Sequence, residues 1–115
     1  MGLLVAKKSE VVIVMPDEQL DTNTSPEAEK MLMAQLDAGE SRIVIDFSKT
    51  DYMSSAGLRM LLLVYRQVMG KKGCVVLVGL NDEIRDTMEA TGFLEHFKVF
   101  ATPDEGRADL ANCNN

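Results

Sequence analysis

The sequence predicts one α/β domain with a mixed, mostly parallel sheet of four to five strands and four helices. Short β-branched runs alternate with helical segments, at a spacing typical of βαβ units. In two of these runs, residues 42–47 and 74–78, the apolar residues are too close together for a half-exposed strand, so both strands are expected to be buried on both faces. A length of 115 residues favours one hydrophobic core over two.

The N-terminal part is expected to add an antiparallel hairpin to the edge of this sheet. Apolar runs at residues 3–6 and 11–15 flank a polar turn, and Pro16 ends the second run. After a polar stretch, residues 25–27 read Ser-Pro-Glu, which predicts a helix with Ser25 as N-cap and an acidic residue in its first turn. Gly39 is placed to end this helix in a left-handed conformation.

The middle of the chain predicts a strand at residues 42–47, a loop at 48–53 and a second helix at 55–69. Either Gly70 or Gly73 is expected to close this helix, because glycine adopts the left-handed conformation of a helix C-terminus without strain.

The last third continues the alternation. After the buried strand at 74–78, Asn81 predicts the cap of a third helix that ends at Gly92. A short strand is expected at residues 98–100, and residues 102–105 read Thr-Pro-Asp-Glu, a capping box that opens a fourth helix.

Composition excludes several classes of function. The net charge of −6 disfavours binding to nucleic acid or to an anionic membrane surface. The apolar run at residues 3–6 is too short for a signal peptide or a membrane span, so a cytoplasmic protein is expected. Cys74 and Cys113 form no CxxC pattern, which predicts reduced thiols, no disulfide and no metal or other cofactor.

The second predicted helix has two different faces when its residues are placed at 100° intervals. One wide apolar arc suits the core. The opposite arc mixes two arginines with apolar side chains, which favours a docking surface for a protein partner. Packing of Met60 and Leu63 beneath a neighbouring loop is the alternative. The residues of this outer arc are Ser55, Ala56, Arg59, Met60, Leu63, Arg66 and Gln67.

Two adjacent serines, Ser54 and Ser55, stand at the entrance of this helix. One hydroxyl suffices for an N-cap. The same position also tolerates a phosphate, because helix N–H groups and the positive end of the helix dipole favour an anion there. Gly57 is expected to ease the approach of another protein's active site. A phosphate here would add about 1.5 to 2 negative charges to an acidic rim; the rim is expected to comprise Asp17, Glu18, Asp21, Asp46 and Asp51.

The motif around these serines resembles a known family. Residues 44–48, Val-Ile-Asp-Phe-Ser, and residues 51–58, Asp-Tyr-Met-Ser-Ser-Ala-Gly-Leu, are similar to the signature of STAS domains, specifically the stand-alone bacterial anti-sigma factor antagonists, or anti-anti-sigma factors. The resemblance extends to the hairpin, to Leu20-Asp21 and to the pattern at residues 88–93. It implies a STAS fold over residues 1–111, with 112–115 expected to be a disordered tail.

The resemblance implies a phosphorylation-controlled partner switch and no enzyme activity. Family members bind an anti-sigma factor that is also a serine kinase of the GHKL ATPase type, and a serine phosphatase removes the phosphate that the kinase adds. The acceptor serine of the motif falls on Ser55, with Ser54 as the alternative. The partner-binding residues that this predicts are Asp21, Ser54, Ser55, Arg59, Met60 and Leu63.

Other functions fit the residues less well. Hydrolysis by Ser55 would need His96 as its base, and no nucleophile-elbow pattern surrounds the serine. A receiver-type phosphoaspartate at Asp46 would need Lys71 or Lys72 beside it. The remaining alternative is a constitutive STAS subunit of a signalling assembly or a lipid-transport complex, in which the serine serves only as a helix cap.

Overall fold

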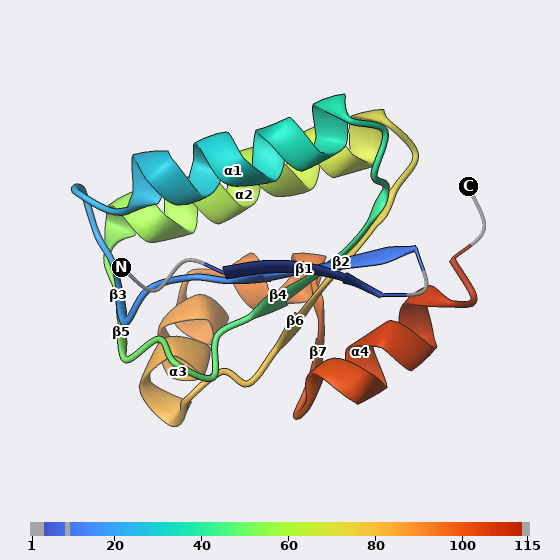
Figure 1. Cartoon of the computed structure of the whole chain (residues 1–115). Helices are drawn as coiled ribbons and strands as arrows, with labels where there is room; N and C mark the ends of the chain where they lie inside the picture. The colour runs from blue at the N-terminus through green and yellow to red at the C-terminus, as the bar shows by residue number, and fades with distance from the viewer. Residues whose placement is uncertain (1–3, 9, 114–115) are drawn as a thin grey trace.

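Five strands form the main sheet of the computed structural model, which describes residues 4–8 and 10–113 (Figure 1). Their order across the sheet is β1-β2-β4-β6-β7, and β1 pairs antiparallel with β2 while the other neighbours are parallel. The mixed, mostly parallel sheet predicted from the sequence is therefore confirmed. The strands are β1 (Leu4–Lys8), β2 (Val11–Met15), β4 (Arg42–Asp46), β6 (Cys74–Val78) and β7 (Lys98–Phe100).

Four α-helices connect and cover these strands, as predicted, and a short 3₁₀ helix precedes β7. Figure 1 shows α1 and α2 side by side above the sheet, with α4 on the opposite face. The helices are α1 (Ser25–Asp37), α2 (Ser55–Gly70), α3 (Asp82–Ala90), η1 (Phe93–His96) and α4 (Pro103–Leu110).

A second, two-stranded parallel sheet joins β3 (Gln19–Leu20) to β5 (Tyr52–Met53). Loops were expected in both places, because two residues are too few for an alternating pattern. This small sheet holds the segment before α1 against the segment before α2.

Alternate residues of each central strand enter different cores. Ile43 and Ile45 join the larger cluster with α1, α2 and α3, whereas Val44 lies under α4 in a smaller cluster. All three side chains are fully buried. Burial on both faces explains why these strands lack a polar alternate residue.

Most predicted helix ends are confirmed. The side chains of Asn81 and Thr102 accept hydrogen bonds from the helix N–H groups of α3 and α4, and Glu105 completes the capping box. Gly39 and Gly92 have positive φ, as expected of left-handed caps.

Two helix ends differ from prediction by a few residues. Thr24, and not Ser25, is the N-cap of α1. The residue with left-handed backbone after α2 is Lys72, with φ of 59°, and neither Gly70 nor Gly73. Gly73 serves packing instead, because a Cβ there would lie 2.5 Å from the Ser41 carbonyl oxygen.

The prediction of reduced thiols is wrong, because Cys74 and Cys113 form a disulfide with a Cα–Cα distance of 6.4 Å. They are 39 positions apart, and only the return of the chain through α4 brings them together. The tail expected to be disordered begins at residue 112. Asn112 and Cys113 belong to the described residues, and their N–H groups donate to the carbonyls of Asp109 and Leu110. The rest of that predicted tail, residues 114–115, lies outside the described residues, as does Leu3 of the first predicted strand.

Within the described ranges, every helix is too short or too polar to cross a lipid bilayer.

Candidate functional site

Three loops meet at the edge of the sheet where the parallel strands end. The loop after β2 accepts a hydrogen bond at the Glu18 carbonyl from the Asp51 N–H, at 2.6 Å. The Asn81 side-chain amide donates to the Asp51 carbonyl at 3.2 Å, which adds the loop after β6. A backbone bond and a side-chain bond therefore hold these three loops together around the start of α2.

The two serines at this edge have different environments. Ser54 is the N-cap of α2, and its hydroxyl accepts a hydrogen bond from the Ala56 N–H at 3.2 Å. Its own N–H donates to the Leu20 carbonyl at 2.8 Å. Ser55 is the first helical residue and is exposed, and its hydroxyl has no hydrogen-bond partner among the described residues. Only the Ser55 hydroxyl is thus uncommitted.

Gly57 has a packing role that differs from the expected one. It is buried, and a Cβ built on it would lie 2.8 Å from Met53 Cγ and 2.9 Å from the Leu20 carbonyl oxygen. Both atoms belong to the small β3–β5 sheet, so the absence of a side chain lets that sheet pack directly on α2. The expectation that Gly57 makes room for another protein is therefore wrong.

Asp21 shapes the loop before α1. Its carboxylate accepts hydrogen bonds from the N–H groups of Asn23 at 2.9 Å and Thr24 at 3.1 Å. The backbone hydrogen bonds from Thr24 and Asn23 lower the pKa of Asp21, because they stabilise the charged carboxylate. Asp21 is half exposed, so the charge that fixes the loop is also accessible to a partner.

A groove of about 340 Å³ runs between the N-terminal halves of α1 and α2 and begins beside the two serines. Ala56, Arg59 and Leu63 line it from α2, and Pro26 and Lys30 line it from α1. The groove combines apolar walls with two cationic side chains and with the carboxylate of Glu29, so it offers an apolar surface beside charges of both signs.

The predicted docking residues of α2 do not all reach the surface. Arg59 is exposed and Leu63 is 39% exposed, but Met60 is only 2% exposed. Met60 packs in the main core, on the helix that lies alongside α1, and not beneath a loop as the packing alternative expected. Tyr52 of β5 is 48% exposed, two residues before Ser54, and was missed as a surface candidate. The available signal in the sequence was an aromatic residue inside the signature.

Asp46 lies inside the molecule and not on the acidic rim. It is 2% exposed, and its Oδ1 accepts a hydrogen bond from the Ser48 N–H at 2.9 Å. Lys71 and Lys72 precede β6 at the opposite end of the sheet, since Cys74 pairs with Arg42 while Asp46 pairs with Val78. A receiver-type site is therefore not assembled.

The single histidine lies away from the serines. His96 is in contact with Tyr65, with ring centroids 5.2 Å apart. Tyr65 follows Ser55 by ten residues along α2, which is roughly 15 Å of helix. The imidazole required for a serine nucleophile is not within reach of Ser55.

Comparison with known proteins gives consistent similarities. The model of the STAS domain family matches residues 3–106. The anti-sigma factor antagonist BtrV of Bordetella bronchiseptica is 44% identical over 98 residues, which cover 85% of this chain and 78% of BtrV.

Solved structures with this fold include two anti-sigma factor antagonists. One from Thermotoga maritima has a TM-score of 0.90 at 19% identity, covering 96% of this chain and 95% of that one. The Bacillus cell fate determinant SpoIIAA in its phosphorylated form has a TM-score of 0.75 at 17% identity, covering 94% and 98%. At these identities the structural likeness shows the fold alone.

Proposed function

Because this chain belongs to the STAS domain family, among the anti-sigma factor antagonists, we propose that it is a phosphorylation-controlled binding switch. These antagonists are regulatory binding proteins. Unmodified, the protein sequesters an anti-sigma factor, and phosphorylation of Ser55 releases that partner. The observation that carries the proposal is the exposed, uncommitted Ser55 hydroxyl beside a serine that already caps the helix.

The position of Ser55 allows modification without damage to the fold. A phosphate at the first helical residue lies near unpaired N–H groups and the positive end of the α2 dipole. Arg59 follows Ser55 by four residues, so a turn of helix brings its guanidinium to the same face. The local structure therefore tolerates the added charge. The phosphate is expected to change the affinity for the partner and not the stability of the fold.

The proposed docking surface combines the groove with the acidic loops beside it. Leu63 supplies exposed apolar area, and Arg59 and Lys30 supply positive charge at the groove. Asp21 follows Leu20, whose carbonyl accepts the Ser54 N–H, and Tyr52 precedes the serines in β5. A phosphate adds about 1.5 to 2 negative charges at this boundary. A partner that presents acidic side chains to Arg59 would then clash with the phosphate group and be repelled by its negative charge.

The proposed partners follow from the resemblance to the anti-sigma factor antagonists. The anti-sigma factor is itself a serine kinase of the GHKL ATPase type, which transfers phosphate from ATP to Ser55, and a serine phosphatase hydrolyses the phosphoserine. Because ATP and the transcription machinery are cytoplasmic in bacteria, we place the switch in the cytoplasm.

The test uses the full chain carrying phosphoserine at position 55, with binding to the GHKL-type anti-sigma kinase measured by titration calorimetry. We expect phosphorylation, and also Ser55→Asp, to weaken binding on the order of tenfold or more, because like charges at a docked surface are unfavourable. Ser55→Ala should bind as the wild type does and should gain no phosphate from kinase and ATP.

Ser54→Ala is the matched control. It should lower stability by about 1 kcal/mol through loss of the cap, and it should still be phosphorylated at Ser55. If the Ser55→Ala protein still gains phosphate from the kinase and ATP, the acceptor is Ser54 and not Ser55. Unchanged binding after phosphorylation of Ser55 would contradict the switch and favour a constitutive STAS subunit.

A further inference from the structure

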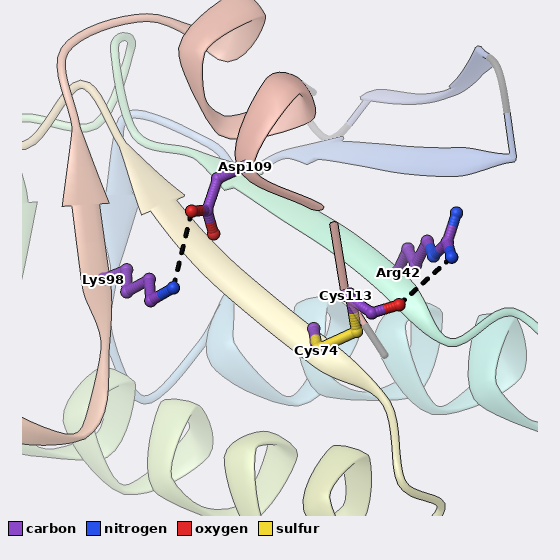
Figure 2. Close-up of a disulfide and its surroundings, with 5 residues drawn as sticks. All are labelled: Arg42, Cys74, Lys98, Asp109 and Cys113. Carbon is purple, nitrogen blue, oxygen red and sulfur yellow. Dashed lines mark hydrogen bonds and ion pairs between the residues drawn. A yellow bond between two sulfur atoms is a disulfide. The ribbon is translucent and has the colours of Figure 1, made fainter. Parts of the chain in front are cut away.

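The disulfide lies at the far end of the sheet from the serines and joins two segments of different kinds. Figure 2 shows Cys74, the first residue of β6, bonded to Cys113, which follows α4. Both cysteines are half buried and line a groove of about 240 Å³, which gives small reagents a route toward the disulfide. The bond fastens the C-terminal end of α4 to a central strand.

The noncovalent attachment of α4 is modest. Only Gly106 and Leu110 of its eight residues are buried. A Cβ on Gly106 would lie 2.9 Å from a Val78 methyl group, so the helix touches the sheet closely at that point. Leu110 is the one large side chain that α4 contributes to the smaller core.

Grooves flank α4 on both sides. The 240 Å³ groove separates it from β6, β7 and the end of α2, and a second groove of about 340 Å³ lies toward Val11 and Arg42. A helix with open space on both sides loses few contacts when it lifts.

Two polar contacts support the same end of α4. The Arg42 guanidinium donates to the Cys113 carbonyl at 3.2 Å, and Lys98 pairs with Asp109 at 3.4 Å (Figure 2). The lysine side chain is 71% exposed, and exposed ion pairs contribute little. The covalent bond is therefore the strongest attachment at this end of the helix.

We propose that Cys74 and Cys113 form a reversible redox tie that controls how often the C-terminal half of α4 opens. In the cytoplasm proposed above, disulfides are uncommon and usually redox-sensing. Oxidation forms the disulfide and holds α4 on the smaller core. After reduction, only the packing of Leu110 and the polar contacts hold this end of the helix. Opening then exposes the valines beneath the helix.

Both directions of the chemistry balance. Hydrogen peroxide oxidises one thiol to a sulfenic acid, and the second oxygen atom of the peroxide leaves as water. The other thiol then condenses with the sulfenic acid, which forms the disulfide and releases a second water. For reduction, a dithiol attacks one sulfur through a mixed disulfide; its second thiol completes the exchange. The protein gains two thiols, and the dithiol leaves as its own disulfide.

The test is hydrogen exchange of the full-length protein after peroxide treatment, with and without a dithiol such as dithiothreitol. We expect the dithiol to speed amide exchange over residues 107–113 by about tenfold or more, because the tie no longer limits local opening. Exchange within α1 should speed up by a clearly smaller factor, because the disulfide does not hold that helix. Alkylation with iodoacetamide should add no groups to the peroxide-treated protein and two to the reduced one.

Cys113→Ser is the matched variant, and its α4 should exchange quickly with or without the dithiol. Two results would overturn the proposal. One is free thiols in the peroxide-treated protein, and the other is an α4 exchange rate in the wild type that is the same with and without the dithiol. The wild-type comparison stands even where the variant folds poorly. Because no readout involves Ser55 or a partner, the result is independent of the proposed switch.

Discussion

Gly57 determines how closely the small sheet approaches α2. Its missing side chain leaves the space that Met53 Cγ and the Leu20 carbonyl occupy, at 2.8 and 2.9 Å from where a Cβ would be. Leu20 is fully buried and its backbone also holds the Ser54 N–H. One glycine thus supports both the core and the position of the serine pair.

Gly57→Ala should destabilise the protein by roughly 1 to 3 kcal/mol, because the added methyl group overpacks this contact with backbone that cannot move aside. Gly70→Ala is the matched control on the same helix, since a Cβ there meets nothing within 4 Å. It should be neutral or stabilising by up to about 1 kcal/mol. Urea unfolding of both variants checks the difference; equal stabilities would contradict the close packing at Gly57.

The serine pair shows what a sequence can and cannot predict at this scale. Adjacent hydroxyls at a helix entrance predict one cap, but the assignment depends on the residue at which the helix begins, and such boundaries shift by one or two positions. The extended backbone of Ser54, with ψ of 178°, makes it the cap. The same uncertainty explains why Ser25 was predicted to cap α1 in place of Thr24.

At the scale of the element, the outer arc of α2 presents Leu63 to solvent but hides Met60. Helical periodicity places Met60 and Leu63 together, but it does not predict which neighbour covers that arc. α1 runs alongside α2 (Figure 1). Met60 is only 2% exposed, whereas Leu63 is 39% exposed and lines the groove between the two helices. Long, strongly patterned elements were predictable, whereas the two-residue strands β3 and β5 carry too little pattern.

Leu63→Glu and Met60→Ala should separate docking from packing. Leu63→Glu should weaken binding to the anti-sigma kinase with little change in melting temperature, because its side chain is 39% exposed. Met60→Ala should cost about 2 to 5 kcal/mol of stability through a core cavity. Thermal unfolding and calorimetric binding on each variant check both outcomes; a large loss of stability in Leu63→Glu would assign that residue to the core.

For the whole molecule, the sheet separates two kinds of site. The serines and acidic loops lie where β4 and β6 end, and the disulfide lies where β6 begins. The parallel topology was predictable because each buried strand shows its own pattern. The Cys74–Cys113 pairing was not, because it depends on the path of α4 back across the sheet and not on any local signal.

Because five strand residues span roughly 13 Å, the two ends should act independently on stability. The changes in unfolding free energy for Ser55→Asp and Cys113→Ser should add in the double variant within about 0.5 kcal/mol. Chemical unfolding of the two single variants and the double variant measures this cycle. A coupling well above that value would mean that the sheet transmits strain between its ends.

The β3–β5 pairing has a consequence for how this surface can change over generations. Glu18 accepts hydrogen bonds from Asp51 and Tyr52, and Leu20 accepts one from Ser54. The segment before α1 therefore supports the segment before α2 through backbone hydrogen bonds. Substitutions in the segment before α1 can therefore change the position of the acceptor serine while both serines stay the same. Related switches can in this way come to bind different partners without any change in the residue that is modified.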